Sequence, residues 1–346
     1  MSPEPGDQGG NGGGSGIRPV AVLPALDRPD LTGRLAGRAL SGPRVKEWLI
    51  ERFLLLNGIA SIAIIALIFL FLFREGVRAL WEVPIADFFG HVGEDPVSGA
   101  PIYKFMWQPV SEPEKFSLVP LILGSFLVAF PATLISTLFG VAVGIYLSEV
   151  AGTRTREILK PCVELLAGIP TVVLGFFFLV VVASLLQDAL GTRYRLNAFL
   201  GALGVSLVII PVIASLTEDA LRAVPNELRE AAYGLGATRW QTIYRTVLPA
   251  GVSGVAAAVI LGFGRALGET MIVLMATGNG AVVTGNVFST VRTMTATIAA
   301  ELGEVVQHSS HYYALFLVGA VLFGITFAFN LAAEIIVHRL RRKLRM

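Results

Sequence analysis

Two opposite charges lie within the fifth of six long apolar runs. Arg265 and Glu269 are four residues apart in a stretch that is otherwise hydrophobic and rich in glycine. An arginine at the centre of a membrane costs about 2.5–3.5 kcal/mol on insertion scales, and ionisable residues inside spans are functional by default. If the whole run is one helix, a spacing of four residues puts both side chains on one face. We therefore expect Arg265 and Glu269 to share a site.

The chemistry that this pair favours is recognition of an oxyanion. A guanidinium presents a planar fork of N–H donors that fits two phosphate oxygens at once. A carboxylate beside it repels sulfate but can accept a hydrogen bond from a P–OH group. The alternative is a self-neutralised ion pair between helices that approach closely at the surrounding glycines. We assign the predicted substrate pathway to Arg265, Glu269, Thr270 and Asn279.

The composition identifies the class of protein. The chain has 346 residues, of which 54% are hydrophobic and 15% are charged, and its mean hydropathy is +0.70. A soluble domain carries about a quarter charged residues, so the chain is predicted to be an integral membrane protein. Its one cysteine, Cys162, excludes an internal disulfide and a cysteine-rich metal site.

Six apolar runs are long enough to cross about 30 Å of hydrocarbon. The sequence predicts an all-α, polytopic fold with spans near residues 53–73, 118–148, 162–186, 197–219, 249–277 and 312–337. Residues 1–46 are polar, glycine-rich and basic, and we expect a disordered cytoplasmic tail there. Residues 47–346 then form one transmembrane domain.

The distribution of positive charge predicts the orientation. Nineteen Lys and Arg residues fall on the side of the N-terminus and seven on the other side. This asymmetry puts both termini in the cytoplasm and makes the protein multi-pass in the cell (inner or plasma) membrane. Residues 74–117 become an outer loop, in which Trp81 and Trp107 suit the headgroup interface. The basic tail is assigned to orientation and not to binding of nucleic acid.

The loop at residues 222–248 has the pattern of two short helices. Pro225 suits a first helical position, and Gly236 offers a left-handed stop. The segment from Thr238 to Gln241 has the pattern of a capping box. A structured connection of this length is unusual between neighbouring spans, so we interpret it as a docking element.

Several motifs in this chain resemble the permeases of ABC importers. The loop signature E-A-A-x3-G-x9-I-x-L-P is matched by Glu230, Ala231, Ala232, Gly236, Leu248 and Pro249, with Thr246 in place of the isoleucine. The stretch GRALGET at 264–270, followed by Gly278-Asn279, is similar to the phosphate-importer branch, and within it to the PstC-type subunit. Further similar pieces are WQPV at 107–110, YLSEVAG at 146–152 and ELLAGIPTVVLGFF at 164–177.

The resemblance implies a type I ABC importer permease (MetI-like) fold and a non-enzymatic subunit, without a cofactor, that imports inorganic phosphate. It implies that the loop at 222–248 docks into a cytoplasmic ABC ATPase dimer, because this chain has no G-x-x-x-x-G-K-[ST] motif of its own. It further implies a second homologous permease subunit in a heterodimer, which would supply another basic group to the anion. An extracytoplasmic phosphate-binding protein is the expected partner of the loop at 74–117.

Three alternatives stay open. A permease for sulfate or molybdate is the nearest one, and Glu269 argues against it. An intramembrane enzyme would need clustered catalytic side chains, and a passive channel would not need the loop at 222–248. Glu304, His308 and His311 have a helical spacing of metal ligands, but they lie outside the last span, and we assign no metal site. Glu218 and Asp219 are expected to face an interface or the partner ATPase.

Overall fold

The computed structural model describes residues 44–94 and 101–344. Most of the predicted tail, residues 1–43, lies outside the described residues. Within the described residues, six helices are long and apolar enough to cross a membrane: Glu47–Glu82, Val119–Val150, Thr171–Leu190, Ala198–Arg222, Arg239–Leu267 and Ser310–Ile335. The predicted number of spans and the all-α class are thus confirmed, although three of the spans differ in extent from those expected.

The first span belongs to helix α2 (Arg44–Glu82). The structure divides into two units between Ile64 and Ile65, inside this helix. Up to Ile64 its large apolar side chains, such as Phe53 and Ile62, are exposed. A helix that is apolar all round suits a lipid environment. The helix runs nine residues beyond the predicted span, so residues 74–82 of the expected outer loop are helical.

The rest of the outer loop contains short elements that fold on each other. Helix α3 (Ile85–Phe89) is followed by an antiparallel pair, β1 (His91–Glu94) and β2 (Pro101–Lys104). A second antiparallel pair joins β3 (Trp107–Gln108) to β4 (Lys115–Phe116). Trp107 is only 2% exposed, so the expectation that it anchors at the headgroup interface is wrong. Trp81 is exposed, as that role requires.

The core forms between helix α4 (Val119–Ile145) and helix α8 (Ala198–Arg222). Gly140 and Gly144 let the two backbones approach, because a Cβ at Gly144 would lie 2.6 Å from the Cβ of Thr217. Small residues at a helix interface are typical of membrane packing, where close approach supplies the attraction. Helix α4 ends in a π-helical turn, η1 (Tyr146–Val150).

The third span is shorter than predicted. Helix α5 (Thr153–Ala167) is amphipathic and has no buried residue, and the chain then breaks at Gly168–Pro170. The span itself consists of α6 (Thr171–Phe177), the π-helical turn η2 (Phe178–Val182) and α7 (Ala183–Leu190). Pro170 lies in this break and does not kink a helix. It precedes the first residue of α6, a place where its missing N–H costs nothing.

The fifth span differs most from the expectation of one helix over 249–277. Helix α9 (Asn226–Gly234) stands alone, whereas α10 (Arg239–Thr242) continues through the π-helical turn η3 (Ile243–Val247) into α11 (Leu248–Leu267). The π turn lies just before Pro249, which has no N–H for a regular helical bond. After Leu267 the chain leaves the helix, and a short helix, α12 (Met271–Ala276), follows.

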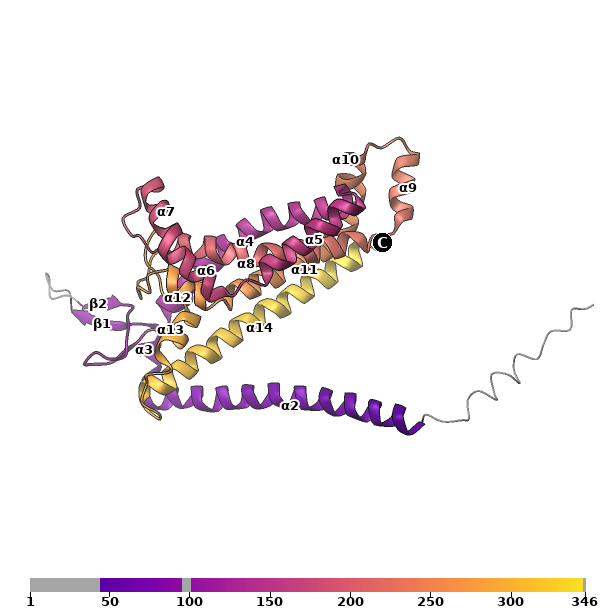
Figure 1. Cartoon of the computed structure of the whole chain (residues 1–346). Coiled ribbons are helices and arrows are strands. Elements are labelled where there is room, and N and C mark those ends of the chain that lie inside the picture. Colours follow the sequence, from indigo (N-terminus) through magenta and orange to yellow (C-terminus); the bar gives the residue numbers. More distant parts are fainter. Residues whose placement is uncertain (1–43, 95–100, 345–346) are drawn as a thin grey trace, which may run out of the picture. The chain divides into compact units, whose positions relative to one another are not determined.

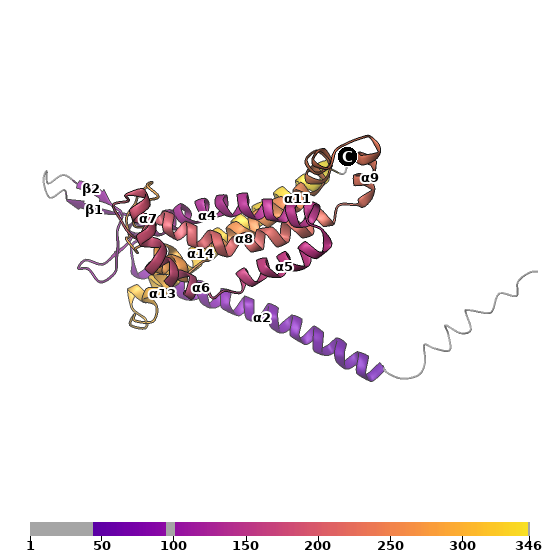
Figure 2. The same ribbon diagram turned by 45° about the horizontal axis from the view of Figure 1, so that its top comes forward.

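The chain closes with α13 (Met294–Glu301) and the long α14 (Ser310–Leu344). In Figure 1 the labels of α9 and α10 lie at one end of the helices, close to the C-terminal end of α14, and those of β1, β2, α3 and α13 lie at the other. Figure 2 shows the same separation after rotation. We call these the loop end and the hairpin end.

Candidate functional site

Arg265 lies in the last turn of α11, and its side chain is exposed. Within the described residues it forms no ion pair and no hydrogen bond. The helix ends at Leu267, between Arg265 and Glu269, so the two do not share one face of a continuous helix as predicted. The alternative of a self-neutralised ion pair is not seen either, because no contact within 4 Å joins them in the part of the chain that is described.

Glu269 and Thr270 form the break between α11 and α12. The side chain of Glu269 is buried, with 9% of the residue exposed, and its carboxylate accepts a hydrogen bond from the backbone N–H of Thr270 at 3.1 Å. The hydroxyl of Thr270 donates to the carbonyl of Gly268 at 3.3 Å. A helix break frees backbone groups that hydrocarbon cannot satisfy, and these two side chains satisfy some of them.

Helix α13 supplies the remaining support for the break. The hydroxyl of Thr295 donates to the backbone carbonyl of Glu269 at 2.7 Å, and Thr293 caps α13 at its N-terminus. The N–H of Met294 donates to the hydroxyl of Ser125 on α4 at 3.0 Å. With eight residues α13 is too short to cross a membrane. It is a buried support for the Glu269 backbone.

Asn279 lies beyond the far end of α12 from Glu269. It adopts a left-handed conformation, with φ of 51°, and its amide donates to the carbonyl of Leu274 at 2.8 Å. The amide of Asn279 thus caps the C-terminal end of α12. Its Oδ1 atom is buried and has no hydrogen-bond partner among the described residues. The structure brings Glu269 and Thr270 together and leaves Asn279 apart from them. The substrate-pathway assignment of all four residues stays a prediction.

Sequence reasoning missed two polar residues of α14 that lie beside α11. Asn330 and Glu334 line a hollow of about 310 Å³ together with Ala257, Ile260 and Leu261 of α11. A Cβ placed on Gly264 would lie 3.3 Å from the Oδ1 atom of Asn330, so the backbone next to Arg265 faces this amide. Both residues are polar and lie within the last apolar run, and this contrast was the signal in the sequence that could have identified them.

A partly buried cluster around the carboxylate of Glu301, at the hairpin end, was also missed. Glu301, at the end of α13, accepts a hydrogen bond from the indole of Trp107 at 3.0 Å and forms an ion pair with Arg292 at 2.6 Å. His311 of α14 lies 2.9 Å from the same carboxylate. These contacts join the β3–β4 pair, α13 and α14. The signals were the tryptophan of the WQPV motif and an acid near two histidines.

The partners of Glu301 change its acidity. Burial by itself raises the pKa of the Glu301 carboxyl, but the hydrogen bonds from His311 and Trp107 and the charge of Arg292 outweigh burial and lower its pKa below the ordinary 4.5. Glu301 is therefore held in its ionised form. Because α13 also supports the backbone of Glu269, the cluster connects the hairpin end to the helix break.

The loop between α8 and α11 folds as the sequence predicted in its main features. Gly236 has a φ of 81°, and the N–H of Ala237 donates to the carbonyl of Ala232 while that of Gly236 donates to Tyr233. This pair of bonds is the Schellman arrangement, which requires a left-handed residue. The capping box of Thr238 and Gln241 is present. The second predicted helix is, however, the beginning of the fifth span.

The loop presents large apolar side chains to the outside. Leu235 is 90% exposed, and Trp240 and Tyr244 are also exposed. Glu230 and Ala231 are exposed on α9, Ala232 is partly so, and Leu248 and Pro249 lie at the start of α11.

Glu149 of the YLSEVAG motif anchors the loop. Its carboxylate receives two bonds from Arg229 of α9, at 2.7 and 3.2 Å, and its backbone carbonyl accepts from Arg239. Hydrogen bonding of the Arg229 guanidinium to the Glu149 carboxylate is the main reason that the pKa of Arg229 is raised. Sequence reasoning assigned no role to Glu149, although an acid within the YLSEVAG motif was a signal.

Other candidates have structural partners. Glu218 is fully buried and paired with Arg156, Lys160 and Arg222, so the expectation that it faces another protein is wrong, whereas Asp219 is exposed and contacts Lys160. His308 bonds to Tyr313, and Glu304, His308 and His311 form no metal-binding group within the described residues.

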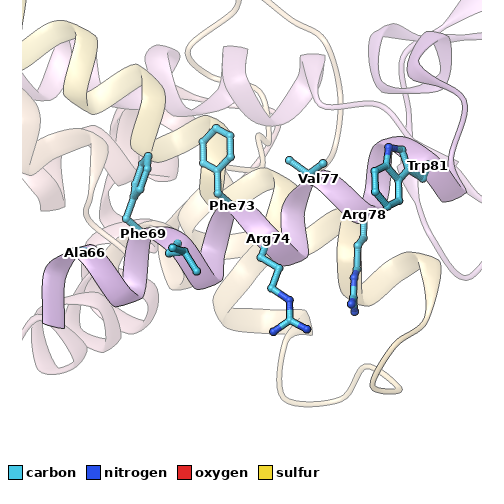
Figure 3. Close-up of a pocket in the computed structure, with 8 residues that line it drawn as sticks. Ala66, Phe69, Phe73, Arg74, Val77, Arg78 and Trp81 are labelled. Atoms are coloured by element: carbon cyan, nitrogen blue, oxygen red, sulfur yellow. The ribbon is translucent and has the colours of Figure 1, made fainter. Parts of the chain in front are cut away.

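The largest hollows include one of about 780 Å³ along α2, which is an open face of a single helix (Figure 3). The close-up shows the Arg74 and Arg78 side chains extending to one side of α2 and those of Phe69 and Phe73 to the other. This hollow contains none of the predicted site residues.

Comparison with known proteins identifies the family. Residues 137–345 match the family described as binding-protein-dependent transport system inner membrane component. A probable ABC transporter permease protein, YqgH of Bacillus subtilis, is 37% identical over 235 residues, which are 67% of this chain and 75% of that protein. The phosphate transport system permease protein PstC of Mesorhizobium japonicum is 34% identical over 255 residues, covering 68% and 76%.

Solved structures show the same fold. The chain resembles a permease chain of a bacterial ABC transporter involved in the import of the acidic polysaccharide alginate, with a TM-score of 0.56 and 17% identity over 86% of this chain and 99% of that one. It also resembles a chain of the MetNI methionine ABC transporter in an inward-facing form, with a TM-score of 0.53 and 19% identity over 67% and 99%. At these identities the likeness concerns the fold alone.

The Glu301 cluster predicts a specific pH dependence. The pKa of Glu301 is lower in the folded protein than in the unfolded chain, so the unfolded chain takes up a proton at Glu301 more readily. The stability that the ionised carboxylate contributes above pH 4.5 is therefore lost as the pH falls below about 4.5. In Glu301→Gln this part of the acid sensitivity should disappear, and at neutral pH the free energy of unfolding should fall by about 1–3 kcal/mol. The measurement is the thermal midpoint of the purified protein as a function of pH.

Glu304→Gln is the matched control, because Glu304 lines one hollow of about 800 Å³ together with Glu301 but has none of these hydrogen bonds. Its pH curve should follow that of the unmodified protein. If the curve of Glu301→Gln also runs parallel to it through the acid range, the cluster does not hold Glu301 in the ionised form.

Proposed function

This chain belongs to the family of inner membrane components of binding-protein-dependent transport systems, and on that premise we propose that it is the permease subunit of an ATP-driven importer of inorganic phosphate. The relatives named as phosphate transport permeases support this substrate. One feature of the chain itself carries the proposal: an exposed guanidinium without a partner among the described residues, next to the helix break at the end of an apolar span.

Arg265 is the main anion contact. A charge in this position is costly unless water or an anion reaches it, and no carboxylate of the described chain neutralises it. Its fork of donors fits two oxygens of a tetrahedral anion. An exposed Arg265 therefore belongs to the surface along which the anion passes. A second cationic group, from the second permease subunit, would balance the remaining charge of a dianion.

Glu269 is the selectivity residue. Its carboxylate has capacity for further hydrogen bonds beyond the one from Thr270. A protonated phosphate oxygen can donate to it, whereas sulfate at neutral pH has no proton to donate and is repelled. The break between α11 and α12 lets the acid and the arginine act on one anion without pairing with each other.

ATP-driven motion reaches this site through one long helix. The segment from Arg239 to Leu267 is helical throughout its 29 residues, about 43 Å at 1.5 Å per residue. Its first turn carries the exposed Trp240 of the loop, and its last turn carries Arg265. The loop residues Glu230, Ala231, Ala232 and Gly236, with Leu248 and Pro249, form the docking element for an ABC ATPase dimer. Displacement of the loop would therefore move Arg265.

The orientation and partners follow from this assignment. The loop end faces the cytoplasm, as the positive-inside count also indicates, and both termini lie on that side of the cell membrane. The hairpin end then faces outward, where an extracytoplasmic phosphate-binding protein delivers the anion. The second permease subunit is a homologous chain in a heterodimer.

The alternatives have weaker support. Glu269 disfavours an importer of sulfate or molybdate, since these anions are fully ionised at neutral pH. Members of this family are transport components, which argues against an intramembrane enzyme. A passive channel leaves the docking loop without a purpose.

Substitution of Arg265 tests the anion contact. Arg265→Lys keeps the charge but loses the bidentate fork, so phosphate uptake should fall at least about tenfold, the equivalent of one charge-assisted hydrogen bond. Arg265→Gln should fall at least as far. The measurement is uptake of radiolabelled phosphate by cells that lack other phosphate importers, with membrane levels checked by blotting. Unmodified uptake by Arg265→Gln would mean that this arginine is structural and the site is elsewhere.

Glu269→Gln in the same assay tests selectivity. Removing the negative charge should reduce the preference for phosphate over sulfate, because an amide donates hydrogen bonds as well as accepting them. The readout is the concentration of unlabelled sulfate that halves phosphate uptake, which should decrease. A preference equal to that of the unmodified protein would remove Glu269 from the site.

Gly236 tests the coupling role of the loop. Gly236→Val places a β-branched residue at a φ of 81°, which such residues strongly disfavour, so uptake should fall while ATP hydrolysis continues without transport. Gly234→Val is the matched control, since a Cβ meets no atom within 4 Å at either glycine and only Gly236 has a positive φ. Coupled transport by Gly236→Val at the level of Gly234→Val would contradict the assignment.

A further inference from the structure

Three arginines line a pocket at the loop end. The pocket has a volume of about 380 Å³ and lies between η1, α5, α8 and α9. Its polar lining consists of Ser148, Thr153, Arg156, Arg222, Asn226 and Arg229. No carboxylate lines it among the described residues. Because a water molecule occupies about 30 Å³ of liquid, the volume suits a small ion with several waters.

The arginines of this pocket differ in how many donors they have free. Arg229 uses all of its nitrogens, on Glu149, on Asn226 and on the carbonyls of Val224 and Leu221. Arg156 uses only its Nε atom, on Glu218. Arg222 lies 3.8 Å from Glu218, beyond hydrogen-bond distance, and its side chain is 48% exposed. Two guanidinium groups therefore present free N–H donors beside the pocket.

The charges around the pocket do not balance. Glu218 is fully buried and has Arg156, Lys160 and Arg222 as its partners, while Asp219 contacts Lys160 at 3.6 Å. Three cations thus face two carboxylates, and one positive charge is left over. The first turn of α5, which contains Thr153, has no side-chain cap, and free N–H groups at a helix start add to the attraction for an anion.

We propose that this pocket is a second anion site, which binds a tetrahedral oxyanion of the phosphate type at the loop end of the protein. Arg156 and Arg222 supply the charged donors, and Thr153 and Asn226 supply neutral ones, whereas the hydroxyl of Ser148 donates to Glu149 at 2.8 Å. The site is separate from Arg265, which lies at the other end of the helix that begins at Arg239. It therefore goes beyond the proposed import pathway.

Occupation of the pocket has a mechanical consequence. Its walls come from the end of α4, from two further helices and from the loop helix α9, so a bound oxyanion connects the loop to the spans. An anion held there restrains α9 relative to α8. The chemistry fits a site through which accumulated oxyanion on the loop side slows movement of the loop.

Equilibrium binding of radiolabelled phosphate to the purified full-length chain tests this site. All variants carry Arg265→Gln, so that the proposed pathway site is absent. In that background Arg222→Gln should weaken phosphate binding at least about tenfold, the equivalent of one hydrogen bond to a charged group. Arg222→Lys should give an intermediate affinity, because it keeps the charge without the fork. In every variant Glu218 retains its ion pairs with Arg156 and Lys160. The thermal midpoint of each variant verifies that it is folded.

Arg154→Gln is the matched control, because Arg154 lies on the same helix as Arg156, is exposed and does not line the pocket. Its phosphate affinity should equal that of the Arg265→Gln parent. The proposal is overturned if Arg222→Gln and Arg154→Gln bind phosphate equally, or if Arg265→Gln alone removes all binding. It is also overturned if Arg222→Gln releases the partner ATPase at unchanged phosphate affinity, since the pocket would then receive an acidic side chain.

The phosphate group can come from two sources, which separate arms of the experiment distinguish. Saturable binding to protein stripped of lipid identifies the free ion as the ligand. A phospholipid that stays bound in native mass spectrometry, and is lost specifically in Arg222→Gln, identifies a headgroup phosphate.

Discussion

In the hydrocarbon of a bilayer, each backbone polar group and each charge needs a partner from the protein or from water. The region between α11 and α12 is organised by that constraint. The fifth span stops being helical at Leu267, and its freed groups are satisfied by local side chains and by Thr295 of α13. Non-helical backbone is tolerated at membrane depth only where protein or a water-filled path surrounds it. We propose that the exposed guanidinium of Arg265 beside this break lines such a path.

The other elements of the site can be understood as support for this break. α13 holds the backbone of Glu269, and Glu301 at its end is held in turn by Trp107, Arg292 and His311. On the opposite side, α11 continues through η3 and α10 back to the loop at Arg239. The break is therefore connected to the hairpin end through α13 and to the loop end through α11.

The sequence predicted features that depend on local pattern. Run length and hydropathy predicted six spans, Gly236 predicted a left-handed stop, and the spacing of Thr238 and Gln241 predicted a capping box, all of which the structure contains. It failed where the outcome depends on distant contacts. The apolar run to Thr277 has no proline, and its only local signal for a helix end at Leu267 is Gly268-Glu269-Thr270, which was interpreted as part of one helix. The support that this break receives from Thr295 of α13 lies outside any local pattern.

The same limit applies to single residues of the site. Arg265 could be identified because charge in an apolar run is conspicuous, yet its lack of a partner could not. Glu149, Glu218 and Glu301 each derive their roles from a residue more than 60 positions away, namely Arg229, Arg156 and Trp107. No periodicity records such pairings.

The most direct test of the account is the accessibility of the break to water and to phosphate. In a Cys162→Ser background, Thr270→Cys should react with a charged, water-soluble thiol reagent, and inorganic phosphate should slow the reaction. Ile272→Cys, two residues further and fully buried, should stay unlabelled. If Thr270→Cys is unreactive toward the charged reagent, or if phosphate leaves its labelling rate unchanged, the helix break is not part of the path of the anion.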